Sequence, residues 1–169
     1  MNKNLVLTGM MGVGKSTIGK ILSDSLNMNF IDTDKIIEKK AQMTVEEIFK
    51  HKGEVYFRDI EKEVCFFSLK KDNNVIALGG GAFMDKDLRD KILTECISFW
   101  LDLDTTALVK RLKISKKRPL ANGKNLEKNL LNIYDQRKSI YKLANFKITC
   151  GEKNTQLIVN KIIQLYENK

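Results

Sequence analysis

The sequence contains one proline, one histidine and three cysteines among its 169 residues, and each scarcity excludes a class of protein. The single histidine, His51, lies between two lysines, which favours a solvated position and leaves a Ser-His-Asp hydrolase little support. Cys65, Cys96 and Cys150 are odd in number and far apart, so neither a disulfide framework nor a paired zinc site is expected. No hydrophobic run approaches a membrane span or a signal segment, which predicts a cytoplasmic protein without a membrane partner.

The chain also lacks a linker rich in proline, glycine or serine. With 43% hydrophobic residues it can bury one sizeable core, so residues 1–169 are predicted to form a single domain. The net charge of +9 could indicate nucleic-acid binding. However, the lysines are scattered beside acidic residues and no aromatic side chains interleave with them, so we expect no nucleic-acid partner. One segment, residues 113–124, is cationic without an acid and holds the only proline.

A phosphate-binding pattern lies close to the N-terminus. The apolar run Leu5 to Leu7 precedes Gly9-Met10-Met11-Gly12-Val13-Gly14-Lys15-Ser16-Thr17, which fits G-x-x-x-x-G-K-[ST]. In such loops backbone N–H groups surround phosphate oxygens, the lysine reaches the β- and γ-phosphates, and the hydroxyl binds Mg²⁺. Apolar residues at helical spacing follow the loop, as the motif requires. The sequence therefore predicts a nucleoside triphosphate site.

Short apolar runs alternate with helical patterns along the chain. The expected strands are residues 4–8, 29–32, 75–78, 97–101 and 146–150. Thr44 to Glu47 forms a capping box, with Gly53 as a stop; further helices are expected over 54–69, from Asp85, from Thr105 and over 126–142. This order predicts an α/β fold with a parallel sheet between two helical layers, which binds ligands beyond the carboxyl ends of its strands.

Two features follow the second and third predicted strands. Asp32 and Asp34 would share one face of an extended segment, so both could point into one cleft, although helix capping explains a single aspartate equally well. Because no acidic residue ends the strand 75–78, Asp32 is the candidate carboxylate on the metal side. Gly79 to Gly81 could form a tight turn or admit a ligand close to the backbone, and the sequence does not choose between these.

Three charged residues lie on two predicted helices. Arg58 and Glu61 are three residues apart on a helix whose expected buried stripe is Phe57, Ile60, Val64 and Phe67. Arg137 lies on the helix whose expected apolar face is Leu130, Leu131, Ile133 and Tyr134. Each could be an exposed helix charge of little consequence.

Taken together, these motifs give the chain a strong resemblance to the shikimate kinase family. Their order and spacing match that family at residues 9–17, 31–34, 47–61, 77–83, 118–120 and 134–137. The resemblance implies a P-loop kinase fold: a three-layer sandwich around a five-stranded parallel sheet, a mobile lid at about 113–124 and a substrate-binding helical region at about 34–62. It also implies transfer of a phosphoryl group from ATP to the 3-hydroxyl of shikimate, a step toward chorismate and the aromatic amino acids.

The resemblance assigns a role to each motif. The amides of residues 12–17 and Lys15 would hold ATP, while Ser16 and Asp32 would hold Mg²⁺. Catalytic roles fall to Lys15, to Asp34 at the substrate hydroxyls and to Arg118 at the transferring phosphoryl group. The shikimate contacts would come from Asp34, Arg58, Gly80, Gly81 and Arg137, with Glu61 orienting Arg58. Arg111 and Lys153 would lie near adenine.

Other functions share the phosphate loop. A gluconate or nucleoside monophosphate kinase would differ only in its acceptor. A GTPase-like switch would need N-K-x-D, but Asn160-Lys161-Ile162-Ile163 lacks the aspartate. A nucleic-acid-dependent NTPase would show steeply salt-dependent binding. Nothing in the sequence indicates an obligate interface, so a monomer is expected.

Overall fold

The computed structural model describes residues 3–114, 126–151 and 154–169. Five parallel strands form one sheet in the order β2-β3-β1-β4-β5. Their bounds are β1 Leu5–Thr8, β2 Asn29–Asp32, β3 Asn74–Ala77, β4 Ile97–Asp102 and β5 Phe146–Thr149. All five predicted strands are present, with ends shifted by one residue at most, because each is a short apolar run with turn residues at its ends.

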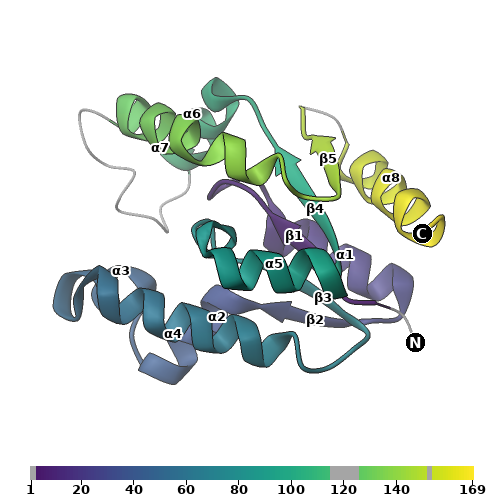
Figure 1. The fold of residues 1–169 in the computed structure, drawn as a ribbon. Helices are drawn as coiled ribbons and strands as arrows, with labels where there is room; N and C mark the ends of the chain where they lie inside the picture. Colours follow the sequence, from purple (N-terminus) through teal and green to yellow (C-terminus); the bar gives the residue numbers. More distant parts are fainter. Residues whose placement is uncertain (1–2, 115–125, 152–153) are drawn as a thin grey trace.

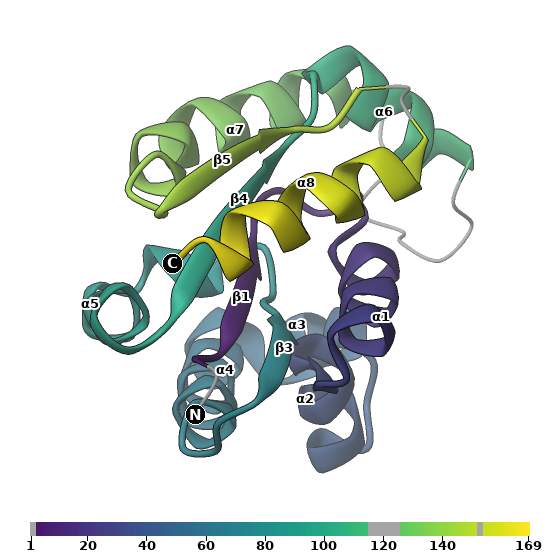
Figure 2. The same ribbon diagram turned by 90° about the vertical axis from the view of Figure 1, so that its right-hand side faces the viewer.

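Helices connect and cover the strands. Their bounds are α1 Lys15–Leu26, α2 Thr33–Ala41, α3 Val45–His51, α4 Gly53–Ser68, α5 Lys86–Glu95, α6 Thr105–Ile114, α7 Leu126–Tyr141 and α8 Thr155–Glu167, with a short 3-10 helix at Ala82–Met84. Figure 1 shows α2, α3 and α4 grouped beside the β2 edge of the sheet. In Figure 2, α1 and α8 lie on one side of the sheet, and α5 and α7 lie on the other. This arrangement is the predicted three-layer sandwich.

Local signals set several helix ends. Thr44 accepts a hydrogen bond from the backbone of Glu47 and Glu47 reaches back to Thr44, which is the predicted capping box at the start of α3. Asp85 caps α5 as expected. Gly53, however, does not merely end α3: it has φ +80° and begins α4, so the chain turns there between two helices.

The apolar residues form two clusters. The larger one surrounds the sheet, and the smaller one joins α2, α3 and α4 through the buried residues Ile37, Ile48, Phe57, Ile60 and Val64. The prediction of the apolar faces is wrong at two residues, because Phe67 is 64% exposed and Leu131 is 39% exposed. Each lies at the solvent side of its helix, where hydrophobicity alone does not bury a residue.

Two further expectations concern the cysteines and membranes. Cys65, Cys96 and Cys150 are all free, as the sequence suggested, and all three are buried. Burial raises the pKa of the Cys96 and Cys150 thiols to about 11, so both remain protonated near neutral pH. None of the helices within the described residues is both long and apolar enough to cross a membrane.

Candidate active site

The phosphate loop joins β1 to α1 in the middle of the sheet. At Gly9 a side chain would collide with the carbonyl oxygen of Leu101 on β4, so the loop can pass there only with glycine. Gly14 has φ +107° and immediately precedes α1. The N-terminus of α1 therefore faces the loop, and its free N–H groups and helix dipole favour a bound phosphate.

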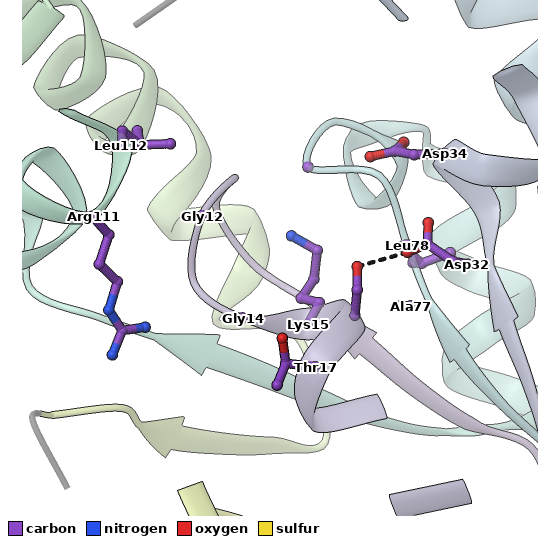
Figure 3. A pocket seen from close by; sticks show the side chains of 12 residues that line it. Gly12, Gly14, Lys15, Thr17, Asp32, Asp34, Ala77, Leu78, Arg111 and Leu112 are labelled. Carbon is purple, nitrogen blue, oxygen red and sulfur yellow. Dashed lines mark hydrogen bonds between the residues drawn. The ribbon is translucent and has the colours of Figure 1, made fainter. Parts of the chain in front are cut away.

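Lys15 lies at the mouth of this loop. Its ammonium group donates to the carbonyl oxygens of Gly9, at 2.8 Å, and Met10, at 2.9 Å. Figure 3 shows Lys15 between Arg111 on one side and the two aspartates on the other. Gly12, Gly14, Lys15, Ser16 and Thr17 line a cavity of about 250 Å³ here, whereas the side chain of Val13 is buried beneath the loop.

Ser16 and Asp32 meet across the floor of this cavity. The Ser16 hydroxyl donates to Asp32 Oδ2 at 2.6 Å, and Asp32 Oδ1 accepts from the Lys35 backbone as the N-cap of α2. Both the metal-side interpretation and the capping interpretation of Asp32 are thus compatible with its geometry. A hydroxyl and a carboxylate supply the oxygen ligands that Mg²⁺ prefers, and Mg²⁺ takes its other ligands from water and phosphate. The pair therefore fits this ion.

Asp34 reaches the same cavity, but not in the way predicted. The extended segment ends at Asp32, and Asp34 already belongs to the first turn of α2. The two aspartates therefore do not share a strand face. The turn from strand to helix nevertheless brings both carboxylates to the wall of the nucleotide cavity, where Figure 3 shows them one above the other.

Thr33, between the two aspartates, was not singled out from the sequence. It is fully buried, donates to the Ala77 carbonyl at 3.3 Å and accepts from the Gly79 amide at 3.0 Å. These two bonds join the start of α2 to the end of β3. Its only sequence signal is its place between Asp32 and Asp34, which does not reveal a partner 44 residues away.

The three glycines after β3 lie between two neighbouring cavities. An added Cβ at Gly79 would lie 2.6 Å from Asp34 Oδ1 and 2.7 Å from Glu61 Oε1, so two carboxyl groups occupy the space of the missing side chain. Gly80 lines the nucleotide cavity. Gly81 lines a second cavity of about 370 Å³ and lies against the guanidinium of Arg58. The turn interpretation is confirmed, because the Ala82 amide donates to the Gly79 carbonyl at 3.2 Å. The groups that lie close to the glycines are the protein's own side chains, so the approach of a ligand stays a prediction.

Arg58 is held by two carboxylates on α4. Its Nη1 donates to Glu61 Oε2 at 2.6 Å, and its Nη2 lies 3.2 Å from Glu54 Oε1. The side chain of Glu61 is only 4% exposed, so this is not the exposed ion pair that sequence spacing alone suggests. Burial raises the pKa of Glu61, and the nearby Arg58 opposes that shift.

Arg137 enters the second cavity from α7. Its Nη1 donates to the Gly80 carbonyl at 3.1 Å. The lining of the cavity holds three cations, Arg58, Lys62 and Arg137, and three acids, Glu54, Glu61 and Asp85. Arg58 and Arg137 are 79 positions apart in the sequence, and their guanidinium groups thus meet beside the glycine turn. Planar guanidinium groups recognise carboxylates through paired hydrogen bonds, so this cavity suits an acidic ligand.

Other predicted site residues lie at the nucleotide end or beyond the described part of the chain. Arg111 donates to the Val13 carbonyl at 3.2 Å and lines the nucleotide cavity beside Leu112. Arg118 and Lys153 lie outside the described residues, as does the predicted lid except for Lys113 and Ile114.

A phosphate loop, a hydroxyl and carboxylate pair suited to Mg²⁺, and an adjacent cavity with two guanidinium groups define a class of protein. The fold and the site are those of a P-loop kinase that acts on a small acidic acceptor. Comparisons with known proteins give the family. A model of the shikimate kinase family matches residues 11–167. The chain belongs to the shikimate kinase family and is an ATP-dependent small-molecule kinase.

Individual relatives agree with this assignment. The chain is 39% identical to a shikimate kinase of Bartonella henselae over 96% of its own length and 78% of the relative's. It is 37% identical to one from a Sulfurihydrogenibium species, over 95% and 96% of the two chains. The solved structure of Acinetobacter baumannii shikimate kinase in complex with shikimate matches with a TM-score of 0.93 and 31% identity, over 99% of this chain and 94% of that one. A gluconokinase from Sinorhizobium meliloti, at 15% identity and a TM-score of 0.57 over 98% and 94%, shares the fold alone.

Proposed function

We propose that this protein transfers the γ-phosphoryl group of ATP to the 3-hydroxyl of shikimate, giving 3-phosphoshikimate and ADP. The observation that carries this proposal is the cavity where the guanidinium groups of Arg58 and Arg137 meet, which adjoins the nucleotide cavity at Gly80 and Gly81. A ligand with a carboxylate at one end and hydroxyls at the other can then place a hydroxyl between Asp34 and the phosphate loop. The product would serve the synthesis of chorismate and the aromatic amino acids.

The described residues divide the work of phosphoryl transfer. Lys15 and the amides at the start of α1 bind and neutralise the phosphates. Asp34 orients the acceptor hydroxyl and accepts its proton, since its carboxylate faces the nucleotide cavity. Arg58, Arg137 and the Gly80 and Gly81 backbone fix the acceptor, and Glu61 fixes Arg58. When Mg²⁺ is bound by Ser16 and Asp32, it supplies positive charge to the phosphates.

Several finer points remain predictions from the sequence. They are the phosphoryl contact of Arg118, the adenine contacts of Arg111 and Lys153, the closure of residues 113–124, the monomeric state and the cytoplasmic location. Replacing Arg118 by Ala is expected to lower turnover by roughly two orders of magnitude with little effect on ATP binding, because a positioned charge would be lost. Turnover that stays at the wild-type level would exclude that role.

The proposal is tested by ADP release with ATP and Mg²⁺ in the presence of shikimate, gluconate, nucleoside monophosphates or no acceptor. ADP release that requires shikimate is the expected result. Release with another acceptor, or without any, would keep the nucleotide site and overturn the substrate. A nucleic-acid-dependent ATPase would instead respond to added DNA or RNA and lose that response steeply with salt.

Asp34→Asn tests the proposed chemistry at the acceptor. The amide can hydrogen-bond the hydroxyl but cannot take its proton, so kcat should fall about 100-fold or more. Asp59→Asn removes the same charge from an exposed position of α4 and serves as the control. If both variants turn over at the wild-type rate while remaining folded, Asp34 has no part in proton transfer.

A further inference from the structure

Tyr141, the last residue of α7, was not assigned any role by the sequence. Its side chain is fully buried, and its ring stacks on Trp100 of β4 with centroids 6.0 Å apart and planes at 24°. Its hydroxyl donates to the Gly80 carbonyl and lies 3.9 Å from Met10 Sδ in the phosphate loop. Tyr141 therefore reaches the point where the nucleotide cavity and the acceptor cavity meet.

The Gly80 carbonyl receives two donors from one helix. Arg137, one turn before Tyr141 on α7, donates its Nη1 to the same oxygen at 3.1 Å. A carbonyl oxygen has two lone pairs, so these two bonds fill its usual capacity. The peptide bond is planar and trans, which makes the Gly81 N–H point opposite to the Gly80 carbonyl. Whatever fixes the carbonyl also fixes the direction of that amide.

The two donors differ in what else they do. Arg137 lines the acceptor cavity, where an incoming carboxylate competes for its guanidinium. The Tyr141 hydroxyl is held by a ring packed on Trp100 and does not line the acceptor cavity, although it also hydrogen-bonds Arg137. Burial raises the pKa of Tyr141, so the hydroxyl stays protonated and able to donate at neutral pH.

We infer that Tyr141 is a positioning residue for the acceptor: it holds the Gly80–Gly81 peptide so that its backbone faces the substrate. This inference rests on the proposed role of that turn in shikimate binding. It assigns Tyr141 no contact with the substrate. Loss of the hydroxyl should weaken shikimate binding while leaving the nucleotide site, anchored by Lys15 and α1, nearly unchanged.

Tyr141→Phe tests the inference, because it removes the hydroxyl and keeps the ring on Trp100. The shikimate KM, and the shikimate Kd from calorimetry without nucleotide, should rise about three- to tenfold, the value of one buried hydrogen bond. The ATP KM should stay close to wild type. The matched control is Tyr166→Phe on α8, which loses a hydrogen bond from a mostly buried hydroxyl to the Lys3 carbonyl.

The control separates positioning from stability. Both variants lose a tyrosine-to-carbonyl bond, so both should melt at a somewhat lower temperature, and assays at about 10 °C keep both folded. An unchanged shikimate Kd in Tyr141→Phe would overturn the inference, as would an equal rise in Tyr166→Phe or an equal rise in the ATP KM. The wild-type protein is measured in the same series: its failure to bind shikimate would refute the proposed function, whereas failure of this inference would appear only in Tyr141→Phe.

Discussion

At the scale of single residues, the site depends on the buried carboxyl group of Glu61. Glu61 is 3% exposed, holds Arg58 with one oxygen and has its other oxygen buried without a hydrogen-bond partner among the described residues. That second oxygen lies beside Gly79, where the carboxylate of Asp34 also arrives. Burial and a neighbouring carboxylate both oppose ionisation of Glu61, while Arg58 favours it.

Replacing Glu61 by Gln should raise the shikimate KM by about tenfold or more, because a buried hydrogen-bonded charge partner of Arg58 is lost. Glu54→Gln is the matched control, since Glu54 contacts the same guanidinium from an exposed position and should change KM little. The two KM values are measured under identical ATP and Mg²⁺ concentrations. Equal effects of both changes would mean that burial does not matter at this ion pair.

The same residue gives a pH prediction with a definite sign. Because burial raises its pKa, Glu61 binds its proton more tightly in the native protein than in the unfolded chain. The tighter binding of this proton stabilises the native protein. Its contribution is complete below the pKa of Glu61 in the unfolded chain, about 4.3, and is lost as the pH rises through the higher pKa of the folded state. The free energy of unfolding of the wild type, relative to Glu61→Gln, should therefore fall with increasing pH in urea titrations. A relative stability that increases with pH would show that Arg58 outweighs burial.

At the scale of elements, α4 connects the acceptor site to a small apolar cluster. Phe57 immediately precedes Arg58, packs against Phe49 with ring centroids 4.6 Å apart and planes tilted by 35°, and is 4% exposed. Phe67, three turns later, is 64% exposed although its sequence spacing suggested the same buried stripe. The helix thus packs against α2 and α3 near its start and presents a different side to solvent near its end.

This difference predicts unequal costs for two identical substitutions. Phe57→Ala should lower the free energy of unfolding by about 3 kcal/mol or more, because it leaves a cavity in the cluster. Phe67→Ala should change it by less than about 0.5 kcal/mol. Denaturant titrations of both variants measure the difference. Comparable losses would mean that Phe67 is buried in solution.

At the scale of the whole molecule, two cavities adjoin at the carboxyl edge of one parallel sheet. The nucleotide cavity is lined by the loop after β1, α1, the start of α2, the end of β3 and α6, and the acceptor cavity by α4, α7 and the turn after β3. The parallel order β2-β3-β1-β4-β5 places all these strand ends at one edge. A change on the nucleotide side should therefore affect nucleotide and metal binding while leaving binding in the acceptor cavity largely intact.

Removal of metal with EDTA should abolish turnover and leave shikimate binding by calorimetry intact, because Ser16 and Asp32 lie on the nucleotide side. Ser16→Ala should raise the Mg²⁺ concentration for half-maximal activity by roughly tenfold. Ser25→Ala, at an exposed position of α1, is the control. Full activity in EDTA, or an unchanged Mg²⁺ requirement in Ser16→Ala, would argue against this metal site.

The sequence predicted much of this molecule because its strongest signals are local. The glycine spacing of residues 9–17, the five apolar runs and the capping residues Thr44 and Asp85 each depend on neighbours within a few positions. The family resemblance joined Arg58, Arg137 and Asp34 into one site. The sequence could not reveal that Phe67 faces solvent, since helical periodicity does not say how far a partner surface extends.

By itself, the sequence determined the phosphate loop, the strand and helix order and the residue types of the site, because these depend on backbone conformation and short-range chemistry. Only the tertiary structure decided which groups touch. It buried Glu61 behind Arg58, placed Thr33 between α2 and β3, and brought Tyr141 to the Gly80 carbonyl 61 residues away. Such contacts depend on how the helices pack on the sheet, and that packing satisfies buried polar groups from distant parts of the chain.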